Sequence, residues 1–288
     1  MIEAFDEVAR DPTAVEQCKV WLLKQKQTQD WKTTKATADA VYALLLRGRE
    51  LLSSQALVQV KLGSLDVTPK PGQAQNLKTV SQSRPEPGTG FYEVRFTPAH
   101  IKPALGKITV KKLDRGVAWG SVHWQYLEDL GKVSAYQNTP LKLTKSLFRK
   151  VTTKGGQVLE PVPPVAASRK SAALHPPLSV GDELVVRLVL RVDRDMEYVH
   201  LKDQRASGTE PVNVLSQYKY QDGLAYYEST RDTATDFFID YLPKGTYVFE
   251  YSTRVQLRGH YQSGLAQIQC LYAPEFNSHS QSLPLVVE

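Results

Sequence analysis

The densest run of groups that could do chemistry lies between residues 193 and 205. It combines carboxylates suited to Ca²⁺ with a histidine that could exchange a proton with a nearby acid. The acids are Asp193, Asp195, Glu197 and Asp203, and the bases are Arg194, His200, Lys202 and Arg205. A calcium loop would place an acid at every second position around a turn glycine, and here the bases offset the acids. A pair of His200 with Asp203 has no nucleophile beside it. We therefore expect an ion-paired loop at a strand end.

No other motif nominates a catalytic, cofactor-binding or metal-binding residue. The sequence has no G-x-S-x-G, H-E-x-x-H, P-loop or helix-opening G-x-G-x-x-G. Its histidines, at positions 100, 123, 175, 200, 260 and 279, are scattered. Cys18 and Cys270 are too far apart in sequence, and in segments too different, to indicate a disulfide framework or a zinc site. We expect a protein that is not an enzyme and has no cofactor.

Two groups of aromatic residues could instead stack on sugars. They are Trp119, Trp124 and Tyr126, and Tyr218, Tyr220, Tyr226 and Tyr227. At a strand period of two, Trp119 faces away from Trp124 and Tyr126, so at least one set points inward. Core packing is the favoured interpretation of both groups, and a carbohydrate platform is the alternative.

The net charge of +6 arises from local clusters of bases. One cluster consists of Lys142, Lys145, Arg149, Lys150 and Lys154, and five more bases lie within residues 102–115. Because these bases alternate with apolar residues, they predict the solvent faces of half-buried strands. No RNA- or DNA-binding motif accompanies them, so no nucleic-acid partner is expected.

Length, hydropathy and patterning set the architecture. The 288 residues suggest two or three domains, and the longest apolar run, at 40–46, is too short to span a membrane. Residues 1–48 predict two helices, the second capped by Thr33 or Thr34 and ended by Gly48. Each helix has one apolar face that the pair alone cannot bury, so we expect further helices outside this sequence.

Period-two patterning begins near Gln55 and predicts a first β domain that ends near Tyr136. Its strands include 58–62, 92–96, 108–110 and 117–126. In a second β domain, one strand face carries Leu184, Val186, Leu188, Leu190 and Val192. A β-hairpin is expected to turn at 243–245, and Cys270 should point into the core.

The stretch 161–177 is rich in proline, and we interpret it as a long loop inside the second domain. The expected fold class is thus mainly β, with antiparallel β-sandwich domains preceded by a short α-helical hairpin.

Several segments, in this order, resemble bacterial α2-macroglobulin-like proteins of the kind found in Bacteroidetes. WLLKQK (21–26) and WKTTKATADAVYAL (31–44) are similar to the last helix pair of the thioester-type α/α domain. WGSVHWQYLE (119–128) is similar to the CUB-like β segment after it. RDMEYVHLKD (194–203), GTY (245–247) and YAPEF (272–276) are similar to the C-terminal macroglobulin-like domain. The resemblance implies a C-terminal fragment with domains at 1–49, 50–137 and 138–288.

The resemblance also implies a function: the non-catalytic scaffold of an endopeptidase inhibitor that traps proteases. Its partners would be the upstream domains of the parent protein and, through the parent, target proteases, in the cell envelope or outside the cell. Cys18 is followed by Lys19-Val20-Trp21, which is not the family's thioester pattern of Cys-x-Glu-Gln. The alternative function is a carbohydrate- or surface-binding β-sandwich module of an exported protein.

Overall fold

The structure is a computed structural model that describes residues 1–45, 58–69, 80–82, 91–113, 120–162 and 177–288. It divides into two compact units. Unit 1 comprises residues 1–24 and 31–122, and unit 2 comprises residues 25–30 and 123–288. No helix in the described residues is long and apolar enough to cross a membrane.

The helices lie at the start of the chain, as predicted. A short π-helix, η1 (Ala4–Val8), precedes α1 (Pro12–Thr28) and α2 (Thr34–Leu45). The Asp11 carboxylate accepts the backbone N–H groups of Thr13 and Ala14 at 3.0 Å, which caps α1. The Thr33 hydroxyl accepts the N–H of Ala36 at 3.1 Å, which confirms the predicted cap of α2. The predicted stop at Gly48 lies outside the described residues.

Unit 1 also contains short strands. One sheet has the order β2-β1-β5, from β1 (Gln59–Leu62), β2 (Leu65–Asp66) and β5 (Ile108–Lys111), and a second pairs β3 (Val80–Gln82) with β4 (Val94–Phe96). Two 3₁₀ turns, η2 (Pro98–His100) and η3 (Pro103–Gly106), precede β5. Within the described part of the predicted strand 117–126, residues 120–126 form no strand and are exposed, so the prediction is wrong there. Alternating residues do not make a strand without a neighbouring strand to bond.

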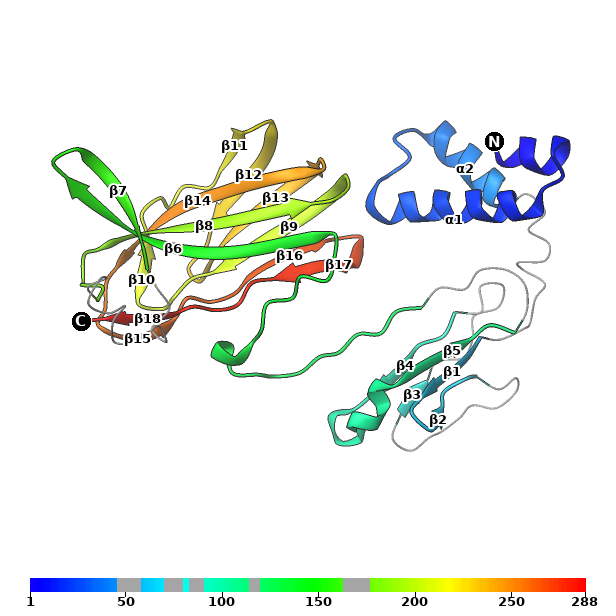
Figure 1. Cartoon of the computed structure of the whole chain (residues 1–288), viewed down its shortest axis with the longest axis horizontal. Helices are drawn as coiled ribbons and strands as arrows, with labels where there is room; N and C mark the ends of the chain where they lie inside the picture. The colour runs from blue at the N-terminus through cyan, green and yellow to red at the C-terminus, as the bar shows by residue number, and fades with distance from the viewer. Residues whose placement is uncertain (46–57, 70–79, 83–90, 114–119, 163–176) are drawn as a thin grey trace. The chain divides into compact units, whose positions relative to one another are not determined.

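Unit 2 is an antiparallel β-sandwich (Figure 1), which confirms the predicted fold class. Its five-stranded sheet has the order β10-β14-β8-β6-β7. These strands are β6 (Leu141–Thr153), β7 (Gly156–Pro161), β8 (Glu183–Val192), β10 (Thr209–Pro211) and β14 (Gly245–Val255). Since β7 and β8 belong to one sheet, the proline-rich stretch between them connects strands of the same domain; residues 163–176 lie outside the described residues.

The opposite sheet of unit 2 has six strands in the order β11-β12-β13-β9-β16-β17. They are β9 (Met196–Gln204), β11 (Gln217–Gln221), β12 (Leu224–Thr230), β13 (Ala234–Leu242), β16 (Ala266–Cys270) and β17 (Ala273–His279). A separate ribbon pairs β15 (Gly259–Gln262) with β18 (Pro284–Val287), and a 3₁₀ turn, η4 (Leu130–Lys132), lies at the start of the unit.

The two large sheets bury one shared apolar core. All five predicted inward residues of β8 are buried, and Cys270 is buried at the end of β16, as predicted. The rings of Tyr226, Phe237 and Phe249 meet at the centre, with Phe237 and Phe249 centroids 5.1 Å apart. The leucines Leu141, Leu143 and Leu147 of β6 belong to the same core cluster as these rings.

The predicted hairpin at 243–245 is wrong in its pairing. Strand β13 pairs with β12 and β9, whereas β14 pairs with β8 and β10, so the chain changes sheets at this turn. Asp195 stabilises the crossing by accepting the N–H of Lys244 at 2.7 Å, and the Tyr247 hydroxyl donates to the Pro243 carbonyl at 2.9 Å. Turn residues predict that the chain reverses direction, but they do not predict whether the two flanking strands belong to one sheet or to two packed sheets.

Candidate functional site

Lys145 lies in the interior of the sandwich, contrary to the prediction that it belongs to a solvated strand face. Its side chain is 1% exposed. In β6 the buried positions are Leu141, Leu143, Lys145 and Leu147, and the residues between them are exposed. Lys145 therefore has the same strand phase as the leucines, and this phase is the feature of the sequence that indicates its burial. The other bases of the cluster are exposed or partly exposed, as predicted: Lys142, Arg149, Lys150 and Lys154.

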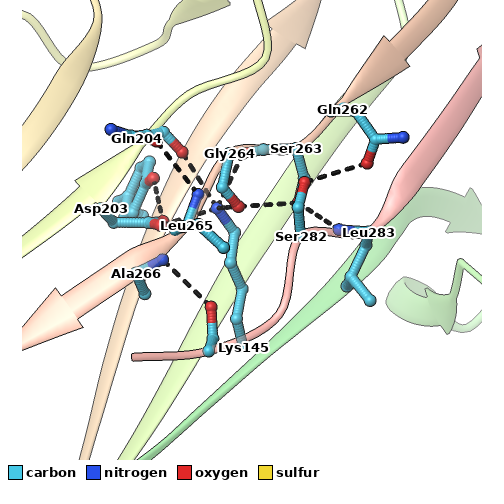
Figure 2. Close-up of polar contacts among 12 residues, drawn as sticks. Lys145, Asp203, Gln204, Gln262, Ser263, Gly264, Leu265, Ala266, Ser282 and Leu283 are labelled. Carbon is cyan, nitrogen blue, oxygen red and sulfur yellow. Dashed lines mark hydrogen bonds and ion pairs between the residues drawn. The ribbon is translucent and has the colours of Figure 1, made fainter. Parts of the chain in front are cut away.

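The Lys145 ammonium is surrounded by oxygen acceptors (Figure 2). Nζ lies 2.6 Å from Oδ1 of Asp203 and donates to the carbonyls of Ser263 at 2.9 Å and Gln204 at 3.0 Å. The Gly264 carbonyl lies at 3.4 Å. An ammonium has three protons, so it satisfies Asp203 and two carbonyls at once. Lys145 belongs to the five-stranded sheet and Asp203 to the six-stranded sheet, so the pair joins the two layers.

Asp203 is held from its other side by Tyr251. The Asp203 side chain is 0% exposed, and its Oδ2 accepts the Tyr251 hydroxyl at 2.5 Å. Tyr251 lies on β14, so the carboxylate of β9 is bound by groups from two strands of the opposite sheet. Such a pair is costly to bury unless its hydrogen bonds are complete, and here each carboxylate oxygen has a donor.

Burial shifts both partners toward their uncharged forms. Desolvation lowers the pKa of Lys145, and the attraction of Asp203 opposes that shift. Desolvation raises the pKa of Asp203, against the opposing effects of Lys145 and Tyr251. The pKa of Tyr251 is raised well above its usual value by burial and by the adjacent carboxylate. The three groups thus influence one another's pKa values and titrate as one coupled cluster.

A small cavity adjoins this cluster inside unit 2. Its lining includes Lys145, Gln204, Tyr251, Thr253 and Ser263. It is large enough for about one water molecule and too small for an organic substrate. The glycine beside it is required by the backbone, because Gly264 has φ +77° and a Cβ there would lie 2.6 Å from the Gln204 carbonyl oxygen.

The expected ion-paired loop is present only at residues 193–195, because Met196–Gln204 form strand β9 inside the six-stranded sheet, so the loop prediction is wrong for the rest of the charged run. Arg194 Nε lies 2.9 Å from Asp193. Asp195 accepts the Lys244 N–H and the Tyr241 hydroxyl, and these bonds lower the pKa of Asp195. Among the described residues, no three metal-ligating side chains gather at one place.

The structure separates His200 from Asp203, which corrects the pair considered from sequence. They lie three residues apart on β9, so their side chains face opposite sides of the sheet. His200 Nε2 instead lies 2.8 Å from Asp236 on β13, and its imidazole stacks on Phe238 with centroids 4.7 Å apart. His200 is therefore part of the outer surface of the sheet, and Asp203 is part of the core.

The aromatic groups divide between core and surface. Tyr226 is buried, as predicted, whereas Tyr218 and Tyr220 are 79% and 77% exposed. Both exposed tyrosines lie on β11 opposite Tyr227 and Ala225 of β12, on the outer face of the six-stranded sheet. Trp124 and Tyr126 are also exposed, so the core interpretation is wrong for these four residues. Tyr227 is partly exposed, and Trp119 lies outside the described residues.

Comparison with known families identifies this sandwich. Residues 142–275 match the model of the "Bacterial Alpha-2-macroglobulin MG10 domain". The chain contains a bacterial alpha-2-macroglobulin MG10 domain. The match includes both Lys145 and Asp203, so the buried pair is a feature of the MG10 domain of this chain. The matched residues lie within the range 138–288 expected for a macroglobulin-like domain, which confirms the resemblance for this part of the chain.

Solved structures similar to this chain include bacterial alpha-2-macroglobulins. Trypsin-activated alpha-2-macroglobulin from Escherichia coli is 13% identical with a TM-score of 0.44, covering 100% of this chain and 18% of that chain. The elastase-activated form has the same identity and TM-score and is covered to 23%. The Salmonella Y1175G mutant is 15% identical with a TM-score of 0.39, covering 99% and 16%. Our chain therefore spans less than a quarter of each structure, and these values carry no functional argument.

One curated relative has a different description. Circularly permutated Ras protein 2 of Dictyostelium discoideum is 24% identical over 110 residues, which is 38% of this chain and 3% of that protein. The chain thus spans a very small part of this relative, and the similarity gives no information on activity.

Proposed function

We propose that this chain is a non-catalytic scaffold portion of a bacterial alpha-2-macroglobulin-like endopeptidase inhibitor. The observation that carries the proposal is the MG10 match over residues 142–275. The domain order 1–49, 50–137 and 138–288 belongs to this proposal, as does export of the parent to the cell envelope or beyond. In such a parent, the target would be a protease, and the immediate partners would be the upstream domains.

The chemistry of the MG10 domain supports a scaffold role. In its polar cluster, Lys145 and Asp203 are closed from solvent, Tyr251 is partly buried, and the adjoining cavity has no room for a substrate. Cys270 is buried, and burial raises the pKa of its thiol, which disfavours a nucleophilic thiolate. The polar groups in the interior therefore stabilise the sandwich rather than act on a ligand.

The scaffold role is tested by dividing the parent protein. A parent shortened to end just before this chain should lose protease trapping, and the separately expressed chain should bind it and restore trapping. The comparison variant is the chain with Lys145→Met, which we expect to unfold more easily and therefore to restore less. Full trapping by the shortened parent would refute the scaffold role.

A second candidate function is a carbohydrate- or surface-binding module, which the exposure of Trp124 and Tyr126 favours. Glycan binding that Trp124→Ala abolishes would support it over the scaffold. Tyr226→Phe, which changes a buried ring, should leave such binding unchanged.

A further inference from the structure

The buried pair in the MG10 domain has the geometry of reactants as well as that of an ion pair. Nζ of Lys145 lies 2.6 Å from Oδ1 of Asp203, and both side chains are at most 1% exposed. Water competes poorly at such a site, and fixed intramolecular reactants can have effective concentrations of about 10⁵–10⁸ M. We propose that Lys145 and Asp203 condense to form an intramolecular isopeptide bond between the two sheets.

The atoms of this condensation balance without an added reagent. The ammonium first transfers one proton to the carboxylate, which gives an amine and a carboxylic acid. The amine nitrogen then forms a bond to Cγ of Asp203, and the bond from Cγ to Oδ2 breaks. Oδ2 leaves as water with two of the three original ammonium protons, and the third remains on the amide nitrogen. No oxidant, reductant or cofactor is consumed.

Tyr251 is placed to move the proton that the leaving oxygen needs. Its hydroxyl lies 2.5 Å from Oδ2, so it can donate a proton there and recover one from the amine nitrogen. The tyrosine is unchanged at the end of the reaction. Tyr251 is thus a proton-transfer residue in contact with the reacting carboxyl group.

The surrounding structure also accommodates the products. The amide keeps one N–H, which can donate to either the Gln204 or the Ser263 carbonyl, the two nearest carbonyl acceptors of Nζ. The released water has two protons and can satisfy the carbonyl that is left. The cavity lined by Lys145, Gln204, Tyr251 and Ser263 holds about one water molecule. The hydrogen bonds of the ammonium are therefore replaced rather than lost.

The bond would connect positions 58 residues apart in sequence, one in each layer of the sandwich. It would prevent the sheets from separating even when the hydrogen bonds are broken. The inference concerns a covalent modification of the domain and does not depend on the proposed function.

Intact mass spectrometry of the purified full chain tests the proposal. The expected mass is the sequence mass minus one water, and digestion should give a branched peptide that joins residues 145 and 203. Asp203→Asn should lose ammonia instead of water and reach the same final mass as the wild-type chain. Lys145→Met should have its full sequence mass, as should wild-type chain kept unfolded from synthesis onward.

Tyr251→Phe separates proton transfer from mere proximity. It should slow appearance of the lighter species on refolding by on the order of a hundredfold, with the same final product. A folded wild-type chain at its full sequence mass, with residues 145 and 203 in separate peptides, would overturn the proposal. Loss of water that persists in Lys145→Met would also overturn it.

Discussion

Removing one partner of the Lys145 and Asp203 pair should destabilise the MG10 domain more than removing both. In Lys145→Met the Asp203 carboxyl keeps the Tyr251 hydroxyl but loses its cation, at a position that is 0% exposed. In Asp203→Val the Lys145 ammonium keeps its carbonyl acceptors but loses the anion. The double variant Lys145→Met/Asp203→Val has no buried charge at either position, and none of the three variants can form the isopeptide bond.

The magnitude follows from leaving one buried charge unpaired. Breaking such a pair typically costs about 3–5 kcal/mol, whereas replacing both members by apolar residues is often neutral. Each single variant should therefore be less stable than the double variant by about 3 kcal/mol or more. For a domain of this size, that difference lowers the melting temperature by roughly 6–12 °C.

The pH dependence gives the comparison a second readout. Burial raises the pKa of Asp203, and the loss of Lys145 removes the principal opposing charge. When the folded-state pKa of a carboxyl group is higher than its unfolded value of about 3.9, the group is protonated in both states below about pH 3.9. In that range it does not lower the free energy of unfolding. The destabilisation of the folded state grows as the pH rises from the unfolded pKa to the folded-state pKa. Lys145→Met should thus approach the stability of the double variant near pH 3.5 and diverge from it at neutral pH.

Urea denaturation followed by β-sheet circular dichroism measures these differences, since most of the strands belong to unit 2. Lys142→Met is the matched control, since it removes an exposed lysine of the same strand and should change stability by less than about 0.5 kcal/mol. Single variants as stable as the double variant, at neutral pH, would refute the reasoning.

Three further predictions concern neighbouring residues. In the Lys145→Met background, where no isopeptide bond forms and Asp203 keeps both carboxyl oxygens, Tyr251→Phe removes the donor to Oδ2 and should cost about 1.5–3 kcal/mol in urea unfolding; a loss under about 0.5 kcal/mol would contradict that bond. Gly264→Ala puts a Cβ 2.6 Å from the Gln204 carbonyl oxygen and should lower the free energy of unfolding by about 1–3 kcal/mol. Gly106→Ala is the control, because a Cβ at Gly106 has no atom within 4 Å. Asp195 has a lowered pKa, so the ionised carboxylate stabilises the folded state fully above about pH 3.9, and this stabilisation is lost as the pH falls through the folded-state pKa. Asp195→Asn should therefore make the free energy of unfolding depend less on pH in the acid range. An unchanged pH dependence in Asp195→Asn would exclude a contribution from this carboxylate.

Local signals in the sequence were sufficient for the elements with strong periodicity. The Thr33 cap and the inward face of β8 depend on neighbouring residues only, so the pattern predicts both correctly. The turn at 243–245 was predicted as a turn, yet its strands join different sheets. Pairing partners depend on long-range contacts that a local pattern does not contain.

The buried pair shows where residue type misleads. A lysine among leucines suggests the exposed positions of a strand, because charged side chains are rarely buried without a partner. The partner, Asp203, lies 58 residues away and on the other sheet. Only the phase of Lys145 with Leu143 and Leu147 indicates its burial. Similarly, Tyr218 and Tyr220 are exposed because the register of β11 with β12 places them on the outer face of the six-stranded sheet, a property of the assembled sheet.

The most direct test of the proposed scaffold role is a protease titration with the chain alone. Trypsin and elastase are incubated with increasing amounts of the folded chain, and their activity is measured on a large protein substrate. The scaffold account predicts full protease activity at every ratio, with the intact parent protein as the inhibiting control. Inhibition that rises in proportion to the added chain would contradict it.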